Sequence, residues 1–190
     1  MSTIDSREGD IGFHTEVYLK IWSWDQRQGS WNLNTRIDRP HGTEKVADIS
    51  FSPTTRDSKD LYLVTTGKDG HIKLWTLSSQ GTSEKESDVW VLRAILNFRS
   101  EIPGSVAWCP DTSLFAVSVG SHVALYDPLS RSLRQTLTSP DCLNIQSTHF
   151  VGPNGRYLLT VGAKSLVVWD IILGSGKSCI CTLNVSMAPN

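Results

Sequence analysis

The chain has 190 residues, and its 18 Lys and Arg against 19 Asp and Glu give a formal net charge of −1. This balance gives no bulk electrostatic argument for binding to nucleic acid or to a membrane. Hydrophobic residues make up 39% of the chain and seven residues are Trp, which favours a globular core. No stretch approaches the roughly 18 apolar residues that a membrane-spanning helix needs.

The N-terminal residues predict a flexible start followed by two strands. Residues 1–16 are expected to be flexible, and the polar stretch Met1–Gly12 lacks the apolar region of a signal peptide. The stretches Val17–Trp24 and Trp31–Ile37 are predicted strands, with a turn between them. Four cysteines at irregular spacing indicate a reduced, intracellular protein.

A β-hairpin is predicted at Leu63–Leu77. Its first part, Leu63–Thr66, is apolar and β-branched, which suits a buried strand. Asp69-Gly70 follows, and this pair is a strong hairpin signal because Gly tolerates positive φ and Asp bonds its own backbone. The second part, His71–Leu77, alternates in polarity and carries Trp75 near its end.

The hairpin recurs along the chain. Phe115–Asp127 and Leu158–Asp170 have the same layout, and each hairpin is preceded by an apolar strand that ends at a proline turn. The aromatic residues that close the successive units are 53, 51 and 43 residues apart: Trp22, Trp75, Tyr126 and Trp169. Periods of about 40–50 residues with four short strands per unit predict a β-propeller. A β-sandwich with coincidental spacing is the alternative.

The predicted fold class is therefore all-β, a partial propeller with three complete four-stranded blades and part of a fourth. Since about 40–45 residues make one blade and a closed ring needs roughly 4–8 blades, the chain is expected to be a piece of a longer protein. The predicted divisions are a flexible segment, a partial blade, three blades (the first with a polar surface insertion at 78–88) and a tail: 1–16, 17–39, 40–98, 104–137, 143–185 and 186–190.

A catalytic or metal site needs side chains that converge, and the sequence offers no convincing set. The five histidines are scattered, and Cys179 and Cys181 have no second pair at zinc spacing. Gly174–Ser178 lacks the first glycine of a phosphate-binding loop. Two basic groupings could contact phosphate, but each is interpreted as a solvated face in preference to a phosphate site: Arg36, Arg39 and Lys45, and Arg131 and Arg134. The sequence thus predicts no enzyme, cofactor, metal or small-molecule substrate.

Lys73-Leu74-Trp75 and Val168-Trp169-Asp170, each after a turn, resemble the WD-repeat family. The resemblance implies blades of four antiparallel strands and a polar network that locks each blade. In this chain the network would consist of four residues: His41, Thr66, Asp69 and Trp75. The other blade aromatics would be Trp22, Tyr126 and Trp169, and the hairpin turns before Tyr126 and Trp169 lack the aspartate. Such a buried network stabilises a fold only when every member is satisfied.

Several landmarks resemble one subgroup, the tandem-propeller subunits of the small-subunit processome in the t-UTP (UTP-A) group. They are Leu19–Trp22, Leu33–Thr35 followed by Pro40-His41, Leu63–Thr65 with Lys68–Gly70 and Lys73–Trp75, Ser113–Ser118 and Leu183–Val185. The resemblance implies a nucleolar scaffold that supports RNA polymerase I transcription and small-subunit rRNA processing. Its partners would be other t-UTP proteins, with pre-rRNA contacted indirectly or through few phosphates. The alternatives are a WD-repeat scaffold of another intracellular complex, or an enzyme with a site built from propeller loops.

Overall fold

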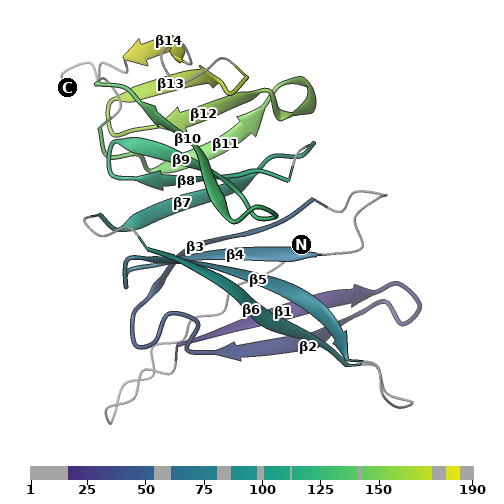
Figure 1. Cartoon of the computed structure of the whole chain (residues 1–190). Helices are drawn as coiled ribbons and strands as arrows, with labels where there is room; N and C mark the ends of the chain where they lie inside the picture. Colours follow the sequence, from purple (N-terminus) through teal and green to yellow (C-terminus); the bar gives the residue numbers. More distant parts are fainter. Residues whose placement is uncertain are drawn as a thin grey trace, which may run out of the picture.

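A computed structural model of the chain describes residues 17–53, 61–80, 87–97, 101–111, 113–140, 143–172 and 179–184. These residues form one two-stranded and three four-stranded antiparallel sheets, which lie one above another (Figure 1). The predicted flexible segment 1–16 and tail 186–190 lie outside the described residues. Among the described residues no helix is long and apolar enough to cross a membrane.

The chain begins with a hairpin of two strands and continues into three meandering blades. The hairpin consists of β1 (Tyr18–Asp25) and β2 (Ser30–Asp38). The first blade consists of β3 (Val46–Phe51), β4 (Tyr62–Gly67), β5 (His71–Gln80) and β6 (Ser87–Asn97). The second consists of β7 (Pro103–Trp108), β8 (Phe115–Val119), β9 (His122–Asp127) and β10 (Ser132–Thr138). The third consists of β11 (Ser147–Val151), the 3-10 turn η1 (Pro153–Gly155), β12 (Tyr157–Val161), β13 (Ser165–Asp170) and β14 (Cys179–Asn184).

One expected boundary is different in the structure. The polar stretch 78–88 was predicted to be a surface insertion, but Ser78 pairs with Val89 and the ladder between β5 and β6 continues to Gln80 and Ser87. Backbone groups make this ladder whatever the side chains are, so the polar composition of the stretch did not reveal it. Residues 81–86 lie outside the described part of the chain.

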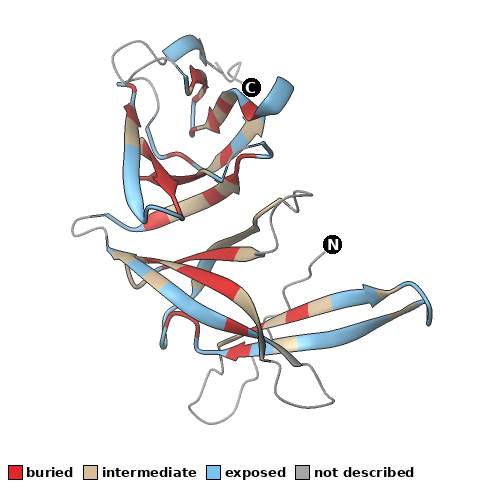
Figure 2. Ribbon diagram, turned by 45° about the vertical axis from the view of Figure 1, so that its right-hand side comes forward, coloured by how far each residue is buried: buried red, intermediate tan, exposed pale blue. Residues whose placement is uncertain are grey.

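Each of the first two blades is buried on both faces, because its strands alternate between two neighbours. On β4, Leu63 belongs to a core shared with the hairpin, and the next residue, Val64, belongs to a core shared with the second blade. On the second blade, Ala116 and Leu125 face the third blade, where they meet Trp169. Figure 2 shows the buried segments in the strands that face another sheet. This double burial explains why the central strands are apolar at successive positions.

Hydrogen bonds join β3 and β4 of the first blade to β7 of the second. The Asp48 carboxylate accepts the Val106 N–H at 2.9 Å, and Trp108 Nε1 donates to the Ser50 carbonyl at 2.9 Å. The Thr66 hydroxyl donates to the Gly104 carbonyl at 2.6 Å. The same strand positions therefore provide both the sheet ladder and the contact between blades.

The second blade has a serine where the first has Thr66. Ser118 Oγ is buried, and it has no hydrogen-bond partner among the described residues. A buried hydroxyl without a partner costs free energy, whereas a bonded one adds to stability. The two equivalent hydroxyls should therefore respond to removal with opposite signs.

We predict that Thr66→Ala lowers the free energy of unfolding by about 1–3 kcal/mol, because it leaves the Gly104 carbonyl without its donor. Ser118→Ala, the matched change, should be neutral or raise it by up to about 1 kcal/mol. Urea denaturation followed by Trp fluorescence measures both. Equal destabilisation by the two changes would contradict the difference between the two sites.

Candidate functional site

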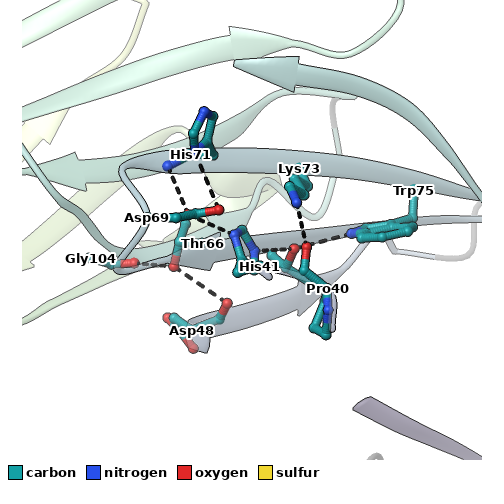
Figure 3. A network of polar contacts seen from close by, with 10 residues as sticks. Pro40, His41, Asp48, Thr66, Asp69, His71, Lys73, Trp75 and Gly104 are labelled. Carbon is teal, nitrogen blue, oxygen red and sulfur yellow. Dashed lines mark hydrogen bonds and ion pairs between the residues drawn. The ribbon is translucent and has the colours of Figure 1, made fainter. Parts of the chain in front are cut away.

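A buried polar network lies at the junction of the hairpin and the first blade (Figure 3). His41 comes from the turn before β3 and is 1% exposed. Its Nδ1 is 2.8 Å from Asp69 Oδ1, in the turn between β4 and β5, and its Nε2 is 2.8 Å from Thr65 Oγ1. Trp75 Nε1 donates to the same Thr65 oxygen at 3.1 Å. Four residues from two turns and two strands thus form one continuous series of hydrogen bonds.

The threonine of this network is Thr65, so the expectation of Thr66 was wrong. Successive side chains on a strand point to opposite faces, so a shift of one residue changes the face. Trp75 pairs with Leu63, which places Thr65, two residues along, on the same face as the indole. Thr66 points to the other face and bonds the second blade. The antiparallel register set by the Asp69-Gly70 turn is the sequence signal that identifies Thr65.

The hydrogen bonds of the network run in one direction when His41 is neutral. The Trp75 indole N–H donates to Thr65, the Thr65 O–H donates to His41 Nε2, and His41 Nδ1–H donates to Asp69. A protonated imidazole would instead present N–H groups to both neighbours and leave the Thr65 proton without this acceptor. Burial lowers the pKa of His41, and this effect outweighs the opposite influence of the Asp69 carboxylate.

Asp69 is held in its ionised form by hydrogen bonds. Burial acts to raise its pKa, but the backbone N–H of His71, at 3.1 Å, and the His41 side chain outweigh it, so the pKa of Asp69 is lowered. Gly67 provides the space that His41 occupies, since a Cβ at this position would lie 2.2 Å from His41 Nδ1. Lys73 Nζ donates to the Pro40 carbonyl at 2.6 Å, which fixes the turn that carries the histidine.

The other blade aromatics have different surroundings. Trp169 Nε1 donates to Thr160 at 3.0 Å, so the third blade repeats the indole–threonine bond, which the sequence analysis did not identify. Tyr126 in the second blade stacks on Phe115 with ring centroids 5.7 Å apart. Trp22 is half-buried on β1 and pairs with Leu33 in the ladder.

Two arginine–aspartate pairs were also missed by sequence reasoning. Arg134 bonds Asp127 at 2.8 Å, and Arg156 bonds Asp170 at 2.6 Å. Each aspartate directly follows the blade aromatic, so the spacing of Tyr126-Asp127 and Trp169-Asp170 was a usable signal. Since Arg36 pairs with Asp38 at 2.6 Å, a member of each of the two basic groupings faces a carboxylate.

The described part of the chain brings together no three or more His, Cys, Asp and Glu side chains that could hold a metal ion. Cys179 and Cys181 are exposed on β14, and Gly174–Ser178 lies outside the described residues. In the network, His41, Thr65 and Trp75 are buried and Asp69 is partly exposed, and each of the four has a hydrogen-bond partner within the network. Its chemistry is therefore that of a structural element which orients the turns at one end of the blade.

We predict that Trp75→Ala lowers the free energy of unfolding by about 3–5 kcal/mol, because it opens a large cavity and removes the indole donor. Trp24→Ala is the control, since Trp24 is 49% exposed and should cost less than about 1.5 kcal/mol. Chemical denaturation measures both. An unchanged denaturation midpoint for Trp75→Ala would contradict the structural role assigned to Trp75.

We also predict that His41 makes the fold less stable in mild acid. Its folded pKa lies below the ordinary value of 6.5, so the unfolded chain binds the proton more readily. The His41 contribution is fully present above pH 6.5 and is lost as pH falls below that value towards the lowered folded pKa. Melting temperatures across this range should fall less steeply for His41→Gln than for the native chain. Identical slopes would show that His41 does not titrate in this way.

A known protein family matches nearly the whole chain. The family model described as the second beta-propeller of WD repeat-containing protein 75 matches residues 1–188. WD repeat-containing protein 75 of Xenopus laevis is 28% identical over 142 residues, which are 74% of this chain and 17% of that protein. U3 small nucleolar RNA-associated protein 17 of Schizosaccharomyces pombe is 24% identical over 183 residues, which are 90% of this chain and 21% of that protein.

The fold is also found among solved structures. A chain in the structure of Chaetomium thermophilum Polycomb Repressive Complex 2 bound to GSK126 matches with a TM-score of 0.62 and 14% identity, over 76% of this chain and 33% of that chain. At this identity the likeness shows the fold alone. The chain spans about one fifth of the length of the relatives named above. On the match over residues 1–188, this chain belongs to the family of the second β-propeller of WD repeat-containing protein 75.

Proposed function

We propose that this chain is part of a non-catalytic WD-repeat scaffold that assembles with other t-UTP proteins of the nucleolar small-subunit processome. Through this assembly it would support pre-rRNA transcription by RNA polymerase I and small-subunit rRNA processing. The observation that carries the proposal is the family match over residues 1–188. The name of the Schizosaccharomyces pombe relative, which associates that protein with U3 small nucleolar RNA, is consistent with it.

The physical properties of the chain favour protein partners over direct RNA contact. The release of counterions from the phosphates supplies most of the non-specific affinity of proteins for nucleic acid. At a net charge of −1, this contribution is weak for the chain. Within the basic groupings, Arg36 and Arg134 each face a carboxylate. The blade-locking residues bond one another and thus hold the turns that carry them, which is a structural role; loops on a rigid scaffold are where partners commonly bind.

We predict that other processome proteins remain bound when the tagged, full-length protein is isolated from nuclear extract and treated with nuclease. The double change Arg39→Ala and Lys45→Ala, which removes two basic side chains, should leave the recovered set unchanged. Mass spectrometry of the bound proteins with and without nuclease measures this. Loss of all partners on nuclease treatment would overturn the scaffold role, and a set without processome proteins would favour a scaffold of another complex.

The purified chain should bind pre-ribosomal RNA only weakly, with a dissociation constant of about 10⁻⁵ M or higher at physiological salt. Filter binding or fluorescence anisotropy with an unrelated RNA of equal length as the control measures this. Tight binding that distinguishes the two RNAs would show that the partner has been assigned to the wrong class.

A further inference from the structure

The outer edge of the first blade is a long strand that pairs on one side only. β6 is the last strand of its sheet, so one row of its backbone N–H and C=O groups has no partner among the described residues (Figure 1). Residues Ser87–Leu92 pair with β5 in unbroken register. Such a row of free backbone groups is a template to which one more strand can be added.

The side chains of β6 lack the features that keep exposed edges from pairing. Arg93 is the only charged residue between Val89 and Asn97, and the strand contains neither proline nor glycine. No other strand of the described chain has more than two exposed large apolar side chains, whereas β6 has four, which are exposed by 38, 38, 39 and 49%: Val89, Val91, Leu92 and Ile95. Natural edge strands usually carry several charges or a proline, so an apolar edge of this length indicates that another segment covers it.

The single charge on this edge lies at a β-bulge. The ladder passes from Ala94 to Leu92 opposite two adjacent residues of β5, so Arg93 is the extra residue. Its side chain is exposed, and no carboxylate among the described residues pairs with it. The fold itself therefore gives this guanidinium group no counter-charge.

The second blade shows how an arginine at this place is paired within a blade. Arg134 is the extra residue of the equivalent bulge between β9 and β10, and it bonds the carboxylate of Asp127 at 2.8 Å. Asp127 directly follows the closing aromatic of its blade, whereas Thr76 holds that position in the first blade. Arg93 thus lacks the carboxylate that its counterpart has, and a carboxylate from outside the blade can take that place.

We propose that an extended segment of a partner protein adds to β6 as a fifth strand and sets a carboxylate against Arg93. Its backbone pairs with the free groups of Ser87–Leu92, and its apolar side chains lie beside Val91 and Leu92. Backbone bonds give an added strand its affinity, and side chains decide which segment binds. The proposal does not depend on the processome role, because the scaffold of any complex can hold a partner in this way.

The test uses a fluorescent peptide of alternating valine and serine with a central glutamate and both ends blocked. One matched peptide has glutamine in place of glutamate, and another is N-methylated at two neighbouring residues, which blocks both of its edges. Fluorescence anisotropy should show that the glutamate peptide binds about two- to fivefold more tightly than the glutamine peptide, the range expected of an exposed ion pair. The N-methylated peptide should not bind.

Hydrogen exchange followed by mass spectrometry locates the binding site. With the glutamate peptide bound, the backbone amides of β6 should exchange more slowly, because the added strand bonds those that face outwards. The net charge of −1 gives the chain no bulk attraction for an acidic peptide, so a preference for glutamate reports a local contact.

The matched protein variants are Arg93→Gln, which removes the charge and leaves the backbone edge intact, and Arg134→Gln, which removes the paired arginine of the second blade. Arg93→Gln should keep the melting temperature and bind the glutamate and glutamine peptides equally. Arg134→Gln should retain the preference for glutamate.

Four outcomes would overturn the proposal: no binding of the glutamate peptide, equal binding of the glutamate and glutamine peptides to the native chain, binding of the N-methylated peptide, or slower exchange only outside β6. A preference for glutamate that persists in Arg93→Gln would also overturn it. Slower exchange of β6 that appears without peptide as the protein concentration is raised would show that a second copy of the chain occupies the edge, and would replace the proposed partner. If Arg93→Gln does not fold, the three peptides still decide the question on the native chain.

Discussion

The fold depends on the burial of each sheet against another sheet. A single blade of four strands cannot bury both of its faces alone, so Leu63 and Val64, adjacent on β4, must find partners in different sheets. The same alternation determines where polar side chains are tolerated. Thr65 and Thr66 are both fully buried, and each is satisfied on its own side, one within its blade and the other across the seam.

The three blades differ in the residue that faces the closing aromatic, and both Trp75 and Trp169 have a threonine that accepts the indole N–H. In the first blade, Trp75 has Thr65 to accept its indole N–H. In the second blade, Val117 replaces the threonine and Tyr126 replaces the tryptophan, so the hydroxyl and the indole are absent together. In the third blade, Thr160 and Trp169 are again both present. A network of this kind is stabilising when complete and costly when partly built.

The sequence predicted the strands, their order in each blade and the closing aromatics, because alternation, turn residues and a repeated spacing are local signals. It gave the network role of Thr65 to Thr66. These adjacent threonines on one strand differ only in the face they occupy, and that face depends on the pairing register. It missed the bond that the Val106 N–H donates to Asp48 and the bond that the Trp108 indole donates to Ser50, each of which joins residues 58 apart in the sequence. Contacts between sheets leave no periodic trace within either strand.

The direction of the hydrogen bonds around Thr65 also constrains the path by which a blade of this kind can diverge. If Trp75 is replaced by tyrosine first, the Thr65 hydroxyl loses a donor but still donates to His41, so Thr65 and the imidazole keep the bond between them. If Thr65 is replaced by valine first, the indole N–H and the imidazole nitrogen both lose their partner. Descent from the Thr–Trp pair to a Val–Tyr pair is therefore easier when the aromatic residue changes before the threonine, and the two positions should covary among related blades.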